Sequence, residues 1–177
     1  HQDDIYHSRY VESMSDAFNA RPDATIFFSG YRPVKNGIVS LDANCIIRAM
    51  LRAPMCVDRL AGIRFFKRLI FSLGNSVCCP TVTYAVDRVG KPVFTSSYKY
   101  NIDWDTFRKL AQLPGSFAYD PHALVGYRVH AGATSKQYID NTGRFEEDKR
   151  MFTEIWGKTT AQMIMKFYTR AYDTYKD

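Results

Sequence analysis

The sequence predicts a fold of the α/β or α+β type, because a few short apolar strands alternate with several amphipathic helices. The 177 residues have room for one domain with its own core. Hydrophobic residues make up 46% of the chain and charged residues 24%, a mix that excludes a wholly disordered protein. No apolar run approaches the roughly 20 residues that a membrane-spanning helix needs.

The first part of the chain is expected to be mainly helical. Apolar spacing and turn residues predict helices at 8–19, 41–51 and 59–73, and a buried strand at 24–29. In the helix at 59–73, most apolar side chains fall within an arc of ~160°, and Arg64, Lys67 and Arg68 gather opposite them. Leu60 and Phe71 fall on the basic side, and an amphipathic helix with apolar residues on its cationic face could lie at a membrane surface.

The second part is expected to add strands and to end in helices. Apolar and β-branched runs bounded by turns predict strands at 81–83, 93–96, 117–119 and 124–129. Helical spacing predicts helices at 105–113, 144–156 and 158–176, with breaks at Pro114-Gly115 and Gly157. The last helix has an apolar stripe that must pack on another surface.

Basic residues are concentrated in one stretch. The net charge is +6, and residues 48–72 contain six basic side chains against the single acid Asp58. Such a patch suggests an anionic neighbour, namely phosphate, acidic lipid or nucleic acid, although composition alone favours a solvated helix face. The cysteines have apolar neighbours and no C-x2-C spacing, so we expect buried, reduced thiols in a cytoplasmic protein. They are Cys45, Cys56, Cys78 and Cys79.

Three polar clusters are candidates for chemistry, since the motifs of P-loop NTPases, dinucleotide enzymes, zincins and α/β-hydrolases are missing. The adjacent carboxylates Asp3 and Asp4 suit Mg²⁺ or Mn²⁺, or else belong to a frayed end that favours the positive end of the next helix. Asp103 precedes Trp104, and partial burial against the indole would make it a general base. The simpler interpretation is helix capping by one of these carboxylates, for which Asp105 is well placed.

The third cluster, Arg128 and His130, ends an expected strand. Alternate residues of a strand point to the same side, so the two side chains are aimed together. They can hold a phosphate, or His130 can ligate a metal ion. A structural pair between Arg128 and a carboxylate agrees equally well with the sequence.

Seven segments form a more specific pattern through their order. They are HQDDIY (1–6), IFFSGY (26–31), LDAN (41–44), GNSVCCPTVTY (74–84), VFTSSYKYNIDWD (93–105), FAYDPHALVGYRVHAGATS (117–135) and RFEEDKRMFTEIW (144–156). Their succession resembles the C-terminal half of a bacterial family 2 glycosyltransferase and covers essentially the whole chain. The resemblance implies the C-terminal portion of an α/β GT-A domain, with a Rossmann-like mixed sheet flanked by helices and followed by C-terminal helices.

The resemblance also implies a reaction and the residues that perform it. Such an enzyme transfers a sugar from a nucleotide-sugar to an acceptor hydroxyl with inversion. Asp103 falls at the position of the catalytic base, with Trp104 beside the substrate. Arg128 and His130 fall on the element that closes over the diphosphate.

Asp3, Asp4 and His130 are the implied ligands of a divalent metal ion, Mg²⁺ or Mn²⁺. The implied partners are a nucleotide-sugar donor and a saccharide or lipid-linked acceptor, in the synthesis of cell-surface polysaccharide or glycolipid. We expect residues 1–157 to be the C-terminal part of the catalytic domain and residues 158–177 to be a helix packed on it. Because the family's nucleotide-binding half is missing from these residues, we expect the isolated chain to be inactive.

Other classes of function stay open at this stage. A pI of about 9.1 and 15% aromatic residues also suit a nucleic-acid- or membrane-binding module without catalysis. The sequence has no evident nucleic-acid-binding signature, so we expect no nucleic-acid partner. The stripe on the last helix also suits a scaffold domain. In the transferase, the helix at 59–73 is expected to rest on the anionic inner face of the membrane.

Overall fold

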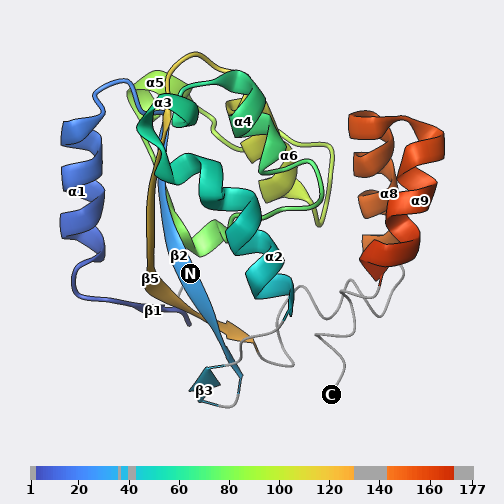
Figure 1. Cartoon of the computed structure of the whole chain (residues 1–177), viewed down its shortest axis with the longest axis horizontal. Helices are drawn as coiled ribbons and strands as arrows, with labels where there is room; N and C mark the ends of the chain where they lie inside the picture. Colours follow the sequence, from blue (N-terminus) through green and yellow to red (C-terminus); the bar gives the residue numbers. More distant parts are fainter. Residues whose placement is uncertain (1–2, 36, 40–42, 130–142, 170–177) are drawn as a thin grey trace.

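The computed structural model of the chain describes residues 3–35, 37–39, 43–129 and 143–169, which form a mixed sheet flanked by helices (Figure 1). The strands are β1 (Ile5–Tyr6), β2 (Ile26–Lys35), β3 (Ile38–Val39), β4 (Val82–Tyr84) and β5 (Phe117–Val129). The helices are α1 (Tyr10–Ala20), α2 (Ala43–Arg52), α3 (Asp58–Ala61), α4 (Arg64–Leu69), α5 (Val86–Val89), α6 (Ile102–Leu110), α8 (Gly143–Trp156) and α9 (Lys158–Tyr168), with 3₁₀ turns η1 (Ala53–Cys56) and η2 (Cys79–Thr81). The structure confirms the predicted mixed α/β class, with a mixed sheet flanked by helices.

β2 is the central strand of the sheet. It pairs in parallel with β5, and antiparallel with β4 near its start and with β3 near its end. β1 pairs antiparallel with the other edge of β5. The register between β2 and β5 shifts at Gly30, where a Cβ would lie 2.5 Å from the carbonyl oxygen of Pro121. Only glycine allows the two backbones to approach so closely.

β5 is one strand instead of the two that we predicted. The expected strands at 117–119 and 124–129, joined by Asp120-Pro121, are parts of a continuous element. Proline has no N–H for a sheet hydrogen bond, so its presence suggested a break. The register shift opposite Gly30 accommodates Pro121 without ending the strand.

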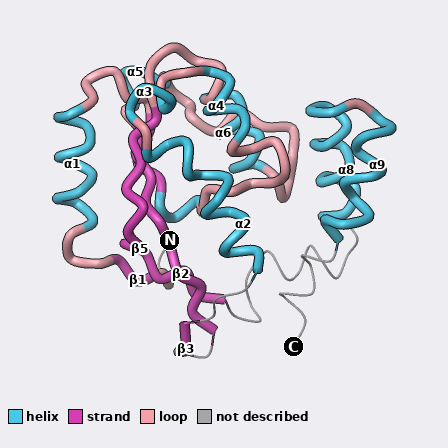
Figure 2. Tube along the Cα trace, viewed as in Figure 1, coloured by secondary structure: helices cyan, strands magenta, loops and turns pink. Residues whose placement is uncertain are grey.

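Two clusters of buried side chains lie on the two faces of the sheet, because successive residues of β2 alternate between them. Phe27 packs with Tyr10 of α1, their ring centroids 5.7 Å apart. Ile26 and Phe28 belong to a larger cluster that also contains residues of α3, α6, α8 and α9. Figure 2 shows α1 on one side of the strands and α2 and α6 on the other.

The two C-terminal helices share the larger core. The ring of Phe152 in α8 lies 5.1 Å from the ring of Trp104 in α6. Ala161 and Met165 of α9 are buried in the same cluster. The apolar stripe expected on the last helix therefore packs inward over the described part of α9, and residues 170–177 lie outside the described residues.

The prediction of one amphipathic helix at 59–73 is wrong. The segment forms two short helices, α3 and α4, which are separated at Gly62 and Ile63. Lys67, which the helical projection placed on a cationic face, is 1% exposed, whereas Phe65 of the apolar arc is 65% exposed. A single cationic face does not form, so residues 59–73 do not present the two-faced helix that was expected to contact a membrane.

Smaller predictions also need correction. Residues 93–96 are loop instead of strand, and α6 spans Ile102–Leu110 instead of 105–113. The cysteines were expected to be buried, but Cys56 is exposed and Cys45, Cys78 and Cys79 are half-buried, although all four are free thiols. Within the described ranges, no helix has both the length and the apolar character needed to cross a bilayer.

Candidate active site around Asp103

Asp103 lies in the first turn of α6, where two hydrogen bonds hold its carboxylate. The Asn75 side chain donates from Nδ2 to Oδ2 at 2.9 Å, and the Trp104 backbone N–H donates to Oδ1 at 2.7 Å. The Val77 N–H donates to Oδ1 of Asn75 at 3.2 Å, which directs Nδ2 of Asn75 towards Asp103. The turn before η2 therefore orients the carboxylate.

Burial raises the pKa of Asp103 from 3.8 to about 6, although its hydrogen bonds and the charge of Arg48 favour the ionised form. A carboxylate that titrates near neutral pH is suited to take a proton from a hydroxyl group and to release it again.

Relative to the Asp103→Asn variant, the wild-type chain is expected to lose stability as the pH rises from about 4 to about 6. The folded state keeps the Asp103 proton up to about pH 6, whereas the unfolded chain releases it near 3.8, so ionisation favours unfolding in this window. Thermal unfolding of both proteins at several pH values measures the difference in Tm. A difference that is constant with pH contradicts the burial of this carboxylate.

Trp104 has a packing role in the structure. Its side chain is 1% exposed, its Nε1 donates to the Phe71 carbonyl oxygen at 3.0 Å, and its ring contacts Phe152 and Tyr168. The resemblance implied a place beside the substrate, but here the indole is closed off from solvent. It anchors α6 in the core and so fixes the position of the helix turn that contains Asp103.

Asp105 does not cap α6. Its carboxylate is buried and accepts hydrogen bonds from Ser96 Oγ at 2.8 Å and from Lys109 Nζ at 2.7 Å. Asn101 precedes the first helical residue, so Asp105 stands too far into the helix to cap it. The carboxylate instead ties the loop before α6 to the helix.

Asp4 lies where β1 meets β5. Its Oδ1 accepts a hydrogen bond from the Arg128 backbone N–H at 3.0 Å, so the first and third predicted clusters are in contact. Burial raises the pKa of Asp4; the Arg128 hydrogen bond opposes the rise and the charge of Asp3 adds to it. The Arg128 side chain is exposed, and His130 lies outside the described residues.

Asp4 and Asp103 both act on the same pair of thiols. Burial raises the pKa values of Cys78 and Cys79, and the charges of the two carboxylates add to the rise. The hydroxyl of Tyr6, which follows Asp4 in β1, donates to the Pro80 carbonyl oxygen at 2.6 Å, so β1 contacts η2.

Two arginines of α2 join this region, although in the sequence they stand out only as basic charge. Arg48 donates from Nη1 to the Tyr31 hydroxyl at 2.9 Å, and its charge acts against the burial that raises the pKa of Asp103. Arg52 is 5% exposed and donates to the Tyr119 hydroxyl at 3.2 Å. Apolar residues of α2 are exposed instead. Apolar spacing alone does not reveal this inverted arrangement, because it assumes that the apolar face is buried.

The acids at the start of the chain fit Mg²⁺ or Mn²⁺. Asp3 and Asp4 supply adjacent carboxylate oxygens, and such ions bind through one or two carboxylates together with water and substrate phosphates. A cation would also offset the repulsion between the two charges. Within the described residues, which do not include His130, no group of three or more His, Cys, Asp or Glu side chains is arranged to hold a metal ion.

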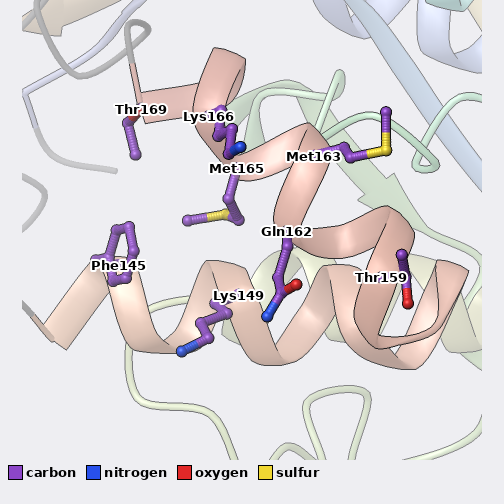
Figure 3. A pocket seen from close by; sticks show the side chains of 8 residues that line it. All are labelled: Phe145, Lys149, Thr159, Gln162, Met163, Met165, Lys166 and Thr169. Carbon is purple, nitrogen blue, oxygen red and sulfur yellow. The ribbon is translucent and has the colours of Figure 1, made fainter.

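A separate pocket lies between α8 and α9 (Figure 3). Its lining combines apolar side chains, including Phe145 and Met165, with the two cations Lys149 and Lys166. None of its lining residues is acidic or a histidine, so the pocket supplies no candidate base. It is not part of the site around Asp103.

In comparisons with known proteins, the chain matches no family model and no curated protein. Together, the fold and the site define a mixed α/β protein with a partly buried carboxylate that titrates near neutral pH. The chain also has a pair of acids, Asp3 and Asp4, that suit a divalent cation. The function therefore has to follow from the chemistry of these groups.

Proposed function

We propose that the chain is the C-terminal part of the catalytic domain of an inverting family 2 glycosyltransferase with a GT-A fold. Asp103 is the main support for this proposal, because its carboxylate is oriented by Asn75 and has a pKa raised by burial to about 6. The ordered sequence motifs and the parallel pairing of β2 with β5 in a mixed sheet also support it.

In the proposed reaction, Asp103 takes the proton of the acceptor hydroxyl as the acceptor oxygen attacks the anomeric carbon. A bond forms between that oxygen and the anomeric carbon. The bond between this carbon and the phosphate oxygen breaks, and its electron pair leaves with the nucleoside diphosphate. Attack from the side opposite the leaving group inverts the anomeric centre. Asn75 keeps the carboxylate in place.

The leaving diphosphate gains negative charge, which a cationic environment stabilises. We assign diphosphate binding to Arg128 and His130, and metal binding to Asp3, Asp4 and His130. When bound, Mg²⁺ or Mn²⁺ neutralises charge on the diphosphate. The contact between Asp4 and the Arg128 backbone supports this assignment, because it joins the proposed metal ligands to the proposed diphosphate-binding element.

The proposed partners are a nucleotide-sugar donor and a saccharide or lipid-linked acceptor, used in the cytoplasm or at the inner face of the membrane. A basic module that binds nucleic acid or membrane without catalysis has less support. Arg52 and Lys67 are buried, so the basic stretch does not form one exposed face.

Turnover by the full-length protein that contains this chain tests the proposal. Incubation with a panel of nucleotide-sugars, Mn²⁺ and saccharide acceptors is expected to release nucleoside diphosphate, which chromatography measures. The 177-residue chain alone is expected to release none, because the proposed nucleotide-binding half lies outside it. Absence of turnover by the full-length protein with every donor contradicts the proposed reaction, and turnover by the isolated chain contradicts the proposed division of the domain.

A further inference from the structure

Three backbone N–H groups just before α6 converge on one carboxylate of α8. Lys99 donates to Oε1 of Glu147 at 2.7 Å, while Tyr100 and Asn101 donate to Oε2 at 2.8 Å and 2.9 Å. Both oxygens of Glu147 are therefore used. The loop that leads into the first turn of α6 is held from a helix more than 40 residues further along the chain.

The Asn101 side chain makes a second link to α8. Its Nδ2 donates to Oδ1 of Asp148 at 2.8 Å, and both side chains are buried. Buried Arg144, one helical turn before Asp148, lies 3.5 Å from this carboxylate, and its guanidinium stands 5.0 Å from the centre of the Tyr100 ring. The acceptors on α8 are thus themselves held in place.

Glu147 fixes the backbone at the entrance to α6, because its carboxylate accepts the N–H of Asn101 at the helix start and those of the two residues before it. The start of a helix has N–H groups without partners inside the helix and a positive end of its dipole. Asn101 stands at this start but makes no capping hydrogen bond with its own side chain. A charged acceptor from α8 therefore determines how the backbone enters the turn that contains Asp103.

We propose that Glu147 is a positioning residue for Asp103. Glu147 holds the backbone before α6 in the position in which the Asp103 carboxylate can contact both Asn75 and the acceptor hydroxyl. This inference rests on the proposed function, because positioning matters only where Asp103 acts as the base. Glu147 touches neither substrate nor reacting atoms and acts through the backbone of residues 99–101. Substitution of Glu147 is therefore expected to change catalysis more than it changes the fold.

The variant Glu147→Gln tests the inference. Glutamine keeps the shape of the side chain, but its amide nitrogen is a donor that faces backbone donors, so part of the hydrogen bonding is lost. The core contact of Trp104 with Phe152 does not involve residue 147, so we expect the chain to stay folded. The matched control is Glu146→Gln, because Glu146 is the exposed neighbour on the same helix.

The first measurement uses the 177-residue chain and follows the Asp103 carboxyl carbon by NMR across a pH titration. In Glu147→Gln, the pKa of Asp103 is expected to move from about 6 towards its ordinary value, because the loosened turn admits water. The main influences on the pKa of Asp103 are its burial, its hydrogen bonds with the Trp104 backbone and Asn75, and the charge of Arg48; the charge of Glu147 is not among them, so the shift reports a change in the surroundings of Asp103. An unchanged pKa in a folded Glu147→Gln chain overturns the inference, whether or not the protein is a transferase.

The second measurement uses the full-length protein. Glu147→Gln is expected to lower kcat by about 10- to 100-fold with little change in the KM for the donor, since a small misplacement of a reacting group has effects of this size. Glu146→Gln is expected to match the wild type. If the wild type is active and Glu147→Gln has an unchanged kcat, the positioning role is overturned. If the wild type is inactive, the proposed function is overturned, and the NMR titration alone decides whether Glu147 positions the carboxylate.

Discussion

Asp103→Asn in the full-length protein is expected to lower kcat by about 100- to 10,000-fold. The amide has the shape of the carboxylate but cannot take the proton of the acceptor hydroxyl. In the wild type, kcat is expected to rise with pH through about 6, because burial raises the pKa of Asp103 to that value and only the ionised carboxylate acts as a base. Initial rates of nucleoside diphosphate release at a series of pH values measure both effects.

Asp87→Asn is the matched control for this experiment. Asp87 is an exposed aspartate of α5, outside the site, so its replacement is expected to leave kcat and the pH profile as in the wild type. Circular dichroism of both variants checks that they are folded. If the folded Asp103→Asn variant turns over as fast as the Asp87→Asn control, another residue is the base.

Lys67→Met is expected to lower the free energy of unfolding by about 3 kcal/mol. The Nζ of Lys67 donates to the carbonyl oxygens of Leu113 at 2.7 Å and Gly115 at 2.6 Å, and it lies 5.2 Å from the centre of the Phe117 ring. Methionine keeps the length of the stem but removes the ammonium group, so both carbonyl oxygens lose their donor. Urea unfolding at neutral pH measures the change.

Arg68→Met provides the comparison, because Arg68 is the exposed neighbour of Lys67 on α4. Its replacement is expected to change the free energy of unfolding by less than about 0.5 kcal/mol, as is usual for surface positions. Equal losses in the two variants would mean that Lys67 is solvated, as the helical projection of residues 59–73 predicted.

The spacing of apolar residues correctly predicted those helices whose buried face is formed by the apolar residues of the segment itself. Apolar spacing at 8–19 and 144–156 identified α1 and α8 nearly to their ends. The prediction at 59–73 failed because periodicity assigns every lysine to the polar face. The carbonyl oxygens that allow Lys67 to be buried lie 46 and 48 residues away, where no helical projection can show them.

The candidate site was predictable in part for the same reason. Asp103 and Asp4 are residue types with evident chemistry, and their surroundings in the sequence suggested roles. Asn75, Arg48 and Glu147 have functional meaning only through their partners, and Asn75 and Glu147 contact residues 28 and 46 positions away. Their own segments contain no local signal for these contacts, although Asn75 and Glu147 both belong to motifs on which the resemblance rests.

The amino-acid sequence by itself determined the mixture of helices and strands and the acids to which we assign the proposed chemistry, because residue chemistry and short-range spacing are properties of neighbours along the chain. Only the tertiary structure decided that the pKa of Asp103 rises to about 6, that Asp4 meets Arg128, and that α8 holds the start of α6. Burial and hydrogen-bond partners depend on which distant segments folding brings together.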